Sequence, residues 1–255
     1  MQSTTLRFGK GFKKPPQPLS KLSELEVYQS DFRTSFKYRG VSPLNGTKRS
    51  MSWVRLREVV QGCPRSVQGI KLHYGLVSNA WIVVVQLMEE DPTTHFLEPI
   101  ADENYLFNEQ AQSFRRLMDT AREALVEEYL DEVWVRRTAV VNFGQLVKPN
   151  THGEPDPSST IFTWHDAVQG LFDDNVDSAL PLEDYYLVVN CIAVEEKFEP
   201  THPNVEFRHG VALNVGVMSD VNGAKVLIDL VSDAASSSAR SRALDYGNLC
   251  PPRCR

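Results

Sequence analysis

The sequence contains no long apolar run. Its longest uninterrupted apolar stretch, Ala80 to Val85, has six residues, whereas a helix needs about 20 apolar residues to cross a bilayer. The first ten residues also lack the apolar segment that a secretory signal contains. We therefore expect a soluble protein with no membrane partner, located in the cytoplasm.

Cysteine and glycine are both scarce. Four cysteines among 255 residues are too few and too scattered for a disulfide scaffold. The 14 glycines form no Gly-x-Gly-x-x-Gly or P-loop pattern, and no Gly-x-Ser-x-Gly sequence surrounds a serine. Cys191 lies in an apolar segment, where we expect it to act as a small hydrophobic residue. The sequence therefore predicts no catalytic, cofactor-binding or metal-binding residue, which favours a protein that is not an enzyme.

The rest of the composition is typical of a folded globular protein. Apolar residues make up 42% of the chain and charged residues 24%, and a chain of this length buries enough surface to fold without a metal or a disulfide. No change in composition divides its middle part. We predict a single α+β domain over residues 41–249, preceded by a basic, Pro-rich arm at 1–40 and followed by a Cys-Pro tail at 250–255.

Charge is unevenly distributed along the chain. Residues 1–40 hold eight basic and three acidic side chains, a net charge of +5, whereas the remaining residues carry a net charge of −11. Pro15, Pro16 and Pro18 make part of this segment stiff and extended. Such an arm can stay solvated, dock on the acidic surface of another copy or bind nucleic acid through its phosphates. The acidic body disfavours nucleic acid.

Strands are predicted in hairpin pairs. Alternating apolar residues from Gly69 to Val77, with His73 on the polar and exposed face, and a β-branched run from Trp81 to Leu87 flank the turn Ser78-Asn79. Three further strands are predicted at Tyr185–Glu195, Val205–Met218 and Lys225–Val231. Asn222-Gly223 indicates a two-residue turn between the last two. Hairpins in succession predict an α+β fold with a mostly antiparallel sheet.

Helices are predicted to pack on this sheet. Their predicted ranges are Ser50–Val60, Tyr105–Leu130 and Ile161–Phe172, with the ambiguous segment Asp131–Val147 also assigned as helix. The longest is expected to be amphipathic, because Phe107, Phe114, Met118 and Leu125 belong to an apolar series that recurs every three or four residues. Residues 150–159 have the composition of a loop.

An acidic segment suggests one possible metal site. Asp173, Asn175 and Asp177 alternate like the oxygen ligands of a calcium loop, with Leu180 at the apolar position and Asp184 at the closing carboxylate. The turn glycine is missing, however, a proline interrupts the segment and a strand is predicted to follow it. The alternative is an acidic loop that simply leaves a helix.

Two pairs of residues suggest a second metal site. His202 with His209, and Cys250 with Cys254, could together supply four zinc ligands. The two pairs lie far apart in the sequence, and the cysteines are separated by three residues rather than the usual two. Free thiols or a reducible disulfide in the tail are the alternative.

The C-terminal segment carries the one resemblance to other proteins. Tyr246-Gly-Asn-Leu-Cys-Pro-Pro-Arg-Cys254 has an aromatic-Gly-x-Leu-Cys-Pro-Pro-x-Cys pattern. It resembles the C-termini of uncharacterised bacterial proteins of the Bacteroidota type, which also carry a segment like Gly69-Ile-Lys-Leu-His-Tyr-Gly75 after a short helix. The resemblance implies a bacterial cytoplasmic protein and brings no known activity with it.

These features favour a non-enzymatic protein that binds other protein chains, including copies of itself as a homo-oligomer. The basic arm and the Cys-Pro tail would dock on neighbouring chains, where each contact is multiplied by the symmetry. A metal-binding protein or metal-dependent hydrolase is one alternative, and nucleic-acid binding through the arm is another.

Overall fold

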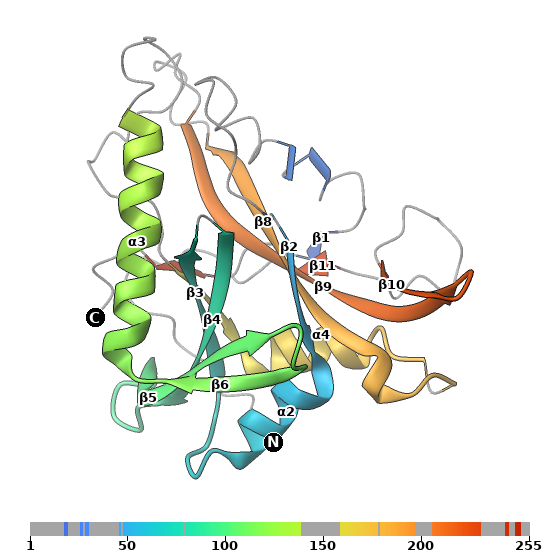
Figure 1. Ribbon diagram of the computed structural model, residues 1–255. Helices are drawn as coiled ribbons and strands as arrows, with labels where there is room; N and C mark the ends of the chain where they lie inside the picture. Colours follow the sequence, from blue (N-terminus) through green and yellow to red (C-terminus); the bar gives the residue numbers. More distant parts are fainter. Residues whose placement is uncertain are drawn as a thin grey trace.

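Strands predominate over helices in the computed structural model (Figure 1). The residues that it describes are 18–19, 26–27, 29–30, 46, 48–78, 80–138, 159–177, 179–196, 206–230, 243–244 and 248–250. Its strands form two antiparallel sheets, here called sheet A and sheet B. The prediction of a mostly antiparallel arrangement is confirmed, although the strands divide between two sheets.

Sheet A combines strands from both ends of the chain. Its order is β1 (Pro18–Leu19), β11 (Ala243–Leu244), β9 (Glu206–Val221), β8 (Tyr185–Glu196) and β2 (Lys48–Ser52), with β10 (Ala224–Asp229) also paired to β9. The predicted turn between β9 and β10 is confirmed, since Asn222 and Gly223 have φ angles of 55° and 81°. Two successive positive φ angles are typical of the type I′ turn that suits a two-residue hairpin.

Sheet B contains the other predicted hairpin. Its order is β12 (Asn248–Cys250), β7 (Ser159–Thr163), β3 (Gly69–Val77), β4 (Ala80–Glu90), β5 (Leu97–Asn108) and β6 (Ser113–Leu117). Strands β3 and β4 pair without interruption from Gly69 opposite Met88 to Val77 opposite Ala80. Their β-branched and aromatic residues therefore form the centre of the sheet, as the sequence predicted.

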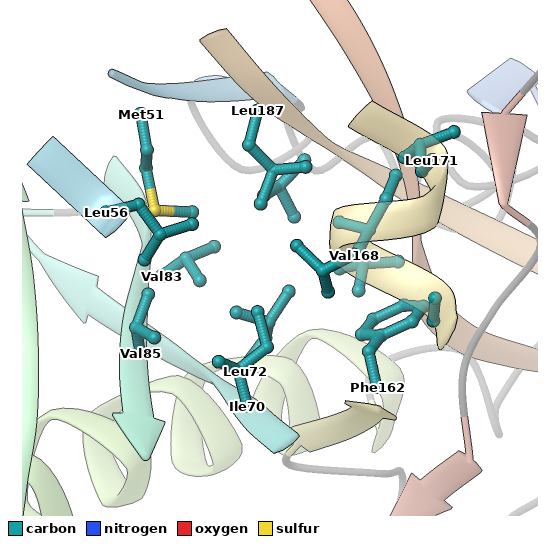
Figure 2. Close-up of a cluster of buried hydrophobic side chains, with 14 of the residues drawn as sticks. Met51, Leu56, Ile70, Leu72, Val83, Val85, Phe162, Val168, Leu171 and Leu187 are labelled. Atoms are coloured by element: carbon teal, nitrogen blue, oxygen red, sulfur yellow. The ribbon is translucent and has the colours of Figure 1, made fainter. Parts of the chain in front are cut away.

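The hydrophobic core lies between the two sheets. The helical segments that accompany these strands include α2 (Trp53–Gly62), α3 (Asp119–Thr138), the π-helix η2 (Trp164–Gln169), α4 (Gly170–Asp173) and the 3₁₀ helix η3 (Leu182–Asp184). Figure 2 shows side chains of β2, α2, β3, β4, β7, η2, α4 and β8 pointing toward one another. At one end of this core, Trp53 of α2 stacks on Phe172 of α4 with ring centroids 3.7 Å apart. One continuous apolar cluster thus holds the sheets and the short helices together.

The long amphipathic helix predicted from Tyr105 to Leu130 is wrong in its first half. That part of the chain forms the β5–β6 hairpin, in which Phe107 lies opposite Phe114 with ring centroids 5.0 Å apart. The turn is fixed by Asn108, whose Oδ1 accepts hydrogen bonds from two backbone N–H groups that follow it. Helix α3 begins only at Asp119 and continues to Thr138, so the apolar series spans two strands, the turn between them and a helix. The remaining residues of the helix predicted to end at Val147 lie outside the described part.

Two other predicted helices have different bounds. The helix predicted from Ser50 begins at Trp53 and ends at Gly62, because Lys48–Ser52 pairs with β8 as strand β2. The helix predicted from Ile161 begins at Trp164, since Ile161 still belongs to strand β7. In both cases, pairing with a distant strand replaces the first residues of the predicted helix.

Strand β3 is buried on both faces rather than on one. Every residue from Gly69 to Leu76 is buried, and the prediction that His73 lies on the surface is wrong, since it is only 6% exposed. Helix α3 packs on β3 and covers its polar face. It approaches closely at Gly75, where an added Cβ atom would lie 3.2 Å from the Cβ of Leu125. The polar side chains of this face therefore belong to the interior.

Candidate interaction site

The β9–β10 hairpin extends away from the rest of sheet A at one side of the molecule (Figure 1). Strand β10 pairs only with β9 among the described strands. Its other edge is therefore open in the part of the chain that the structure describes. An open edge of this kind presents a row of backbone donors and acceptors to which another strand can pair.

The hydrogen-bond pattern identifies which residues face the open edge. Just beyond the end of β10, the N–H of Leu230 donates to the carbonyl of Val215 at 2.9 Å. Because donors alternate along an antiparallel strand, Val226 and Ile228 also direct their backbone groups toward β9. Lys225, Leu227 and Asp229 direct theirs away from it. These three residues are here called the outer row of β10.

One face of the hairpin is apolar and exposed. Val221 in β9 and Val226 and Ile228 in β10 have exposed fractions of 43%, 45% and 42%. The pairing of Ala224 with Val221 and of Val226 with Ser219 places all three side chains on the same face. Val221, Val226 and Ile228 are here called the hairpin patch. An aliphatic patch beside an open strand edge is a feature of surfaces that bind another chain.

A row of polar side chains anchors the base of the hairpin to the sheet. The ammonium group of Lys48 in β2 lies 2.5 Å from Oδ2 of Asp229 in β10. Asn214 in β9 donates to Oδ1 of Asp229 at 3.3 Å and accepts from Nδ2 of Asn190 in β8 at 2.6 Å. Asn190 and Asn214 are fully buried. The direction of the hairpin is thus fixed by contacts that cross four strands.

A second polar cluster lies under helix α3 in sheet B. Nε2 of His73 donates to Oε1 of Gln86 at 2.8 Å, and the amide nitrogen of Gln86 lies 3.5 Å from Oδ1 of Asp119. Asn104 and Arg122 also donate to Oδ1 of Asp119, at 2.9 and 2.8 Å. This cluster joins β3, β4 and β5 to the first turn of α3. Its members satisfy one another, which indicates a structural role.

Burial and neighbouring charge determine the ionisation of this cluster. Burial, together with the charges of Lys71 and Arg122, lowers the pKa of His73 to about 3, despite its hydrogen bond to Gln86. Burial alone would raise the pKa of Asp119, but hydrogen bonds from Asn104 and the N–H of Asp102, with the charge of Arg122, lower it. His73 is therefore neutral and Asp119 ionised at neutral pH.

A groove of about 600 Å³ lies between strand β2 and the β4–β5 hairpin. Its lining includes aliphatic and aromatic side chains such as Ile82 and Phe107, together with Arg49 and Arg115. The guanidinium group of Arg49 already donates to the carbonyl of Trp81 at 2.7 Å and to that of Lys48 at 3.1 Å. Arg49 therefore joins the two sheets, and the groove has no arrangement that identifies a reaction.

The acidic segment from Asp173 to Asp184 links a helix to a strand. Asn175 donates its amide nitrogen to the carbonyl of Leu171 at 2.6 Å, and Oδ1 of Asp177 accepts from the N–H of Ala179 at 2.9 Å. Asp184 lies in the short helix η3. Within the described ranges, no three His, Cys, Asp or Glu side chains come together as a metal site.

Two of the four candidate zinc ligands lie beyond the described residues. His202 and Cys254 are outside them, whereas His209 belongs to β9 and Cys250 to β12, which are strands of different sheets. Cys191 is buried in β8, as predicted, and burial raises the pKa of its thiol.

The described parts of the two termini pair within the chain. Pro18–Leu19 of the predicted arm pairs with β11. Strand β12 pairs with β7 and reaches Cys250, the first residue of the predicted tail. Most of the arm and the end of the tail lie outside the described residues, so the prediction that they dock on other chains is not tested.

No protein family, curated relative or solved structure matches the chain. The described helices include none that is long and apolar enough to span a membrane. The site is therefore defined by the geometry of the hairpin itself.

Sequence analysis identified the β9–β10 hairpin but missed its open edge. Lys225 and Asp229 bracket three aliphatic residues shortly after the Asn222-Gly223 turn, a pattern that predicts a strand but not its position in the sheet. Such a strand can be central or at an edge, and only the pairing with distant strands distinguishes the two positions.

Proposed function

We propose that this protein functions by binding other protein chains, in the first place a second copy of itself, through the β9–β10 hairpin. The observation that carries the proposal is the combination of an open strand edge and an exposed aliphatic patch on one hairpin. Strand addition at such an edge gives affinity through backbone hydrogen bonds, and the side chains beside it give specificity.

Contacts within the chain at the base and the turn of the hairpin support this role. Its base is held by the ion pair of Lys48 and Asp229, and its turn by a hydrogen bond from the N–H of Gly223 to Oδ1 of Asp220 at 2.8 Å. A surface that is already ordered loses less conformational entropy on binding than a mobile one. These contacts therefore lower the entropic cost of binding a partner.

The edge also lacks several features that prevent strand pairing. Natural edge strands are commonly protected by proline, by a bulge or by charges that point inward. Strand β10 contains no proline, and its register with β9 is regular from Ala224 to Asp229. Its two charges have opposite sign, so they do not repel a second copy in the way that a uniformly charged edge would.

The proposal makes the hairpin the principal contact, in place of the arm and tail predicted from the sequence. Docking of these terminal segments on neighbouring chains stays a prediction. It could add to the hairpin contact, because the basic arm and the acidic remainder of the chain have opposite charge.

Self-association of the full chain, measured by native mass spectrometry and light scattering over a wide concentration range, tests the proposal. We expect a wild-type dimer or larger closed oligomer. Replacing both Val226 and Ile228 by threonine keeps two β-branched residues but makes the hairpin patch more polar. This variant should dissociate at roughly tenfold higher concentration.

Val77→Thr is the matched control, because Val77 is also a strand valine with an exposed fraction of 42% but lies in sheet B. It should associate like the wild type. A wild-type chain that remains monomeric at every concentration would overturn the proposal of self-association. If Val77→Thr weakens self-association as much as the double substitution of Val226 and Ile228 does, the contact between the copies lies outside the hairpin patch.

A further inference from the structure

We infer that two copies of the chain join β10 to β10 in antiparallel orientation about a two-fold axis at Leu227, so that their A sheets become one continuous sheet. This inference rests on the proposed function and specifies the partner, the register and the contacts. Two observations support it: the direction of the backbone N–H and C=O groups of β10, and the sequence of side chains from Lys225 to Asp229.

The backbone pattern restricts the register. Lys225, Leu227 and Asp229 form the outer row, as the hydrogen bond from Leu230 to Val215 establishes. In an antiparallel ladder, residues that exchange hydrogen bonds lie directly opposite each other. Outer-row residues must therefore face outer-row residues of the second copy. A register centred on Leu227 uses all three from each copy.

The side chains match in the same register. Lys225 of each copy lies opposite Asp229 of the other, and Leu227 lies opposite its own equivalent. The carboxylate of Asp229 keeps its contacts with Lys48 and Asn214 of its own chain and gains the facing ammonium group of Lys225 as a further cation. Directly opposed residues of opposite charge stabilise an antiparallel pair, whereas like charges destabilise it. The sequence from Lys225 to Asp229 is thus complementary to itself when reversed.

Registers shifted by two residues lose this match. They place either Lys225 or Asp229 opposite Leu227, and they leave one outer-row residue of each copy beyond the paired segment. Registers shifted by one residue place the outer row opposite residues whose donors already face β9. Charge and hydrogen bonding therefore favour the same alignment.

The hairpin patch also becomes continuous in this dimer. Val226 of one copy lies opposite Ile228 of the other, and both side chains are on the exposed face of their strands. Aliphatic pairs directly across a ladder contact each other and bury part of their surface. The exposure of these residues in the single chain is thereby explained by one occupant, the second copy.

Site-directed cross-linking of the full chain tests the register. In the proposed dimer the two Leu227 Cα atoms lie about 5.5 Å apart, within the range of about 4.4–6.8 Å that a disulfide spans. The two Lys225 Cα atoms lie four residues apart along the ladder, about 14 Å. Under mild oxidation, Leu227→Cys should give roughly tenfold more covalent dimer than Lys225→Cys.

The wild-type chain provides the baseline for its own four cysteines, and peptide mass spectrometry should identify the bond between the two introduced residues. Because Leu227 is half-buried, a second experiment avoids replacing it. A mixture of Val226→Cys with Ile228→Cys chains, whose exposed side chains lie opposite each other in the proposed register, should cross-link, whereas each alone should stay at the baseline.

The outcomes separate the inference from the function on which it rests. An oligomeric chain in which neither Leu227→Cys nor the mixture cross-links above the baseline would overturn the β10 register and leave self-association standing. A chain that is monomeric at every concentration would overturn both.

Discussion

Asp102 and Asp119 each accept a hydrogen bond from the backbone N–H of the other. The N–H of Asp119 donates to Oδ1 of Asp102 at 2.9 Å, and the N–H of Asp102 donates to Oδ2 of Asp119 at 3.2 Å. Asp119 is the first residue of α3, and Asp102 has a φ angle of 57° within β5. Two carboxylates at a helix N-terminus complement the partial positive charge of its free N–H groups. This exchange fixes the start of α3 on sheet B.

Replacing Asp119 by alanine should destabilise the protein. The substitution removes the carboxylate that accepts from both Asn104 and Arg122. The side chain of Arg122, which is 12% exposed, then keeps only Asn104 and the exposed Glu123 as partners. Loss of hydrogen bonds to a partly buried charge should lower the free energy of unfolding by about 2 kcal/mol. Urea unfolding followed by tryptophan fluorescence measures this change.

Glu123→Ala is the matched control, because Glu123 also pairs with Arg122 but is 65% exposed. An exposed ion pair contributes about 0–1 kcal/mol, so this variant should unfold at nearly the wild-type urea concentration. Equal effects of the two substitutions would show that Asp119 does not organise the cluster.

The protein should lose stability between pH 7 and pH 5 because of His73. Burial lowers the pKa of His73 from its ordinary 6.5 to about 3, so the unfolded chain binds a proton in this range and the folded chain does not. Preferential protonation of the unfolded state lowers the free energy of unfolding as the pH falls. The free energy of unfolding continues to fall until the pH reaches the pKa of about 3 that His73 has in the folded protein.

His73→Gln should reduce this pH dependence by about 2 kcal/mol between pH 7 and pH 5, from 1.36 kcal/mol per pKa unit. Urea unfolding of wild type and variant at the two pH values gives the difference directly. The same substitution at His165, which is exposed, is the control. An unchanged pH dependence in His73→Gln would mean that His73 binds a proton in the folded protein.

Replacing Lys71 by methionine should stabilise the folded protein. It is 7% exposed, and none of the described carboxylates forms an ion pair with it. An unpaired buried charge is costly, and an apolar residue of similar length avoids this cost. Lys71→Met should raise the free energy of unfolding by about 1 kcal/mol, whereas Arg115→Met, at an exposed cation, should have little effect. Thermal and urea unfolding at pH 7 measure both, and a less stable Lys71→Met would show that the ammonium group has a partner.

Local signals in the sequence were sufficient for the hairpins. Alternation from Gly69 to Val77 and the Asn222-Gly223 turn depend on neighbouring residues alone, so both predicted hairpins are confirmed. The β5–β6 hairpin was missed because Phe107 and Phe114 fit a helical spacing as well as a cross-strand pair. Choosing between these arrangements requires the strand β4, which pairs with β5 from a distant part of the sequence.

The burial of His73 and the edge position of β10 could not be predicted from neighbouring residues alone. His73 alternates with apolar residues as a surface residue would, and it is buried because α3 covers the second face of β3. Likewise, nothing in residues 224–229 distinguishes an edge strand from a central one. The candidate site therefore depends on sheet topology, whereas its self-complementary sequence was visible from the start.

Proline at position 225 should separate self-association from folding. The N–H of Lys225 points away from β9, so Lys225→Pro removes a donor that the hairpin itself does not use, and edge strands tolerate proline in this orientation. The free energy of unfolding of the single chain should change by less than about 1 kcal/mol, while the dimer should dissociate at a concentration roughly tenfold or more above that of the wild type. Lys225→Arg keeps the charge and the donor and should dimerise normally. Val226→Pro should instead destabilise the fold, because the N–H of Val226 donates to β9. A Lys225→Pro chain that is stable and still dimerises like the wild type would show that the outer row of β10 makes no contact in the dimer.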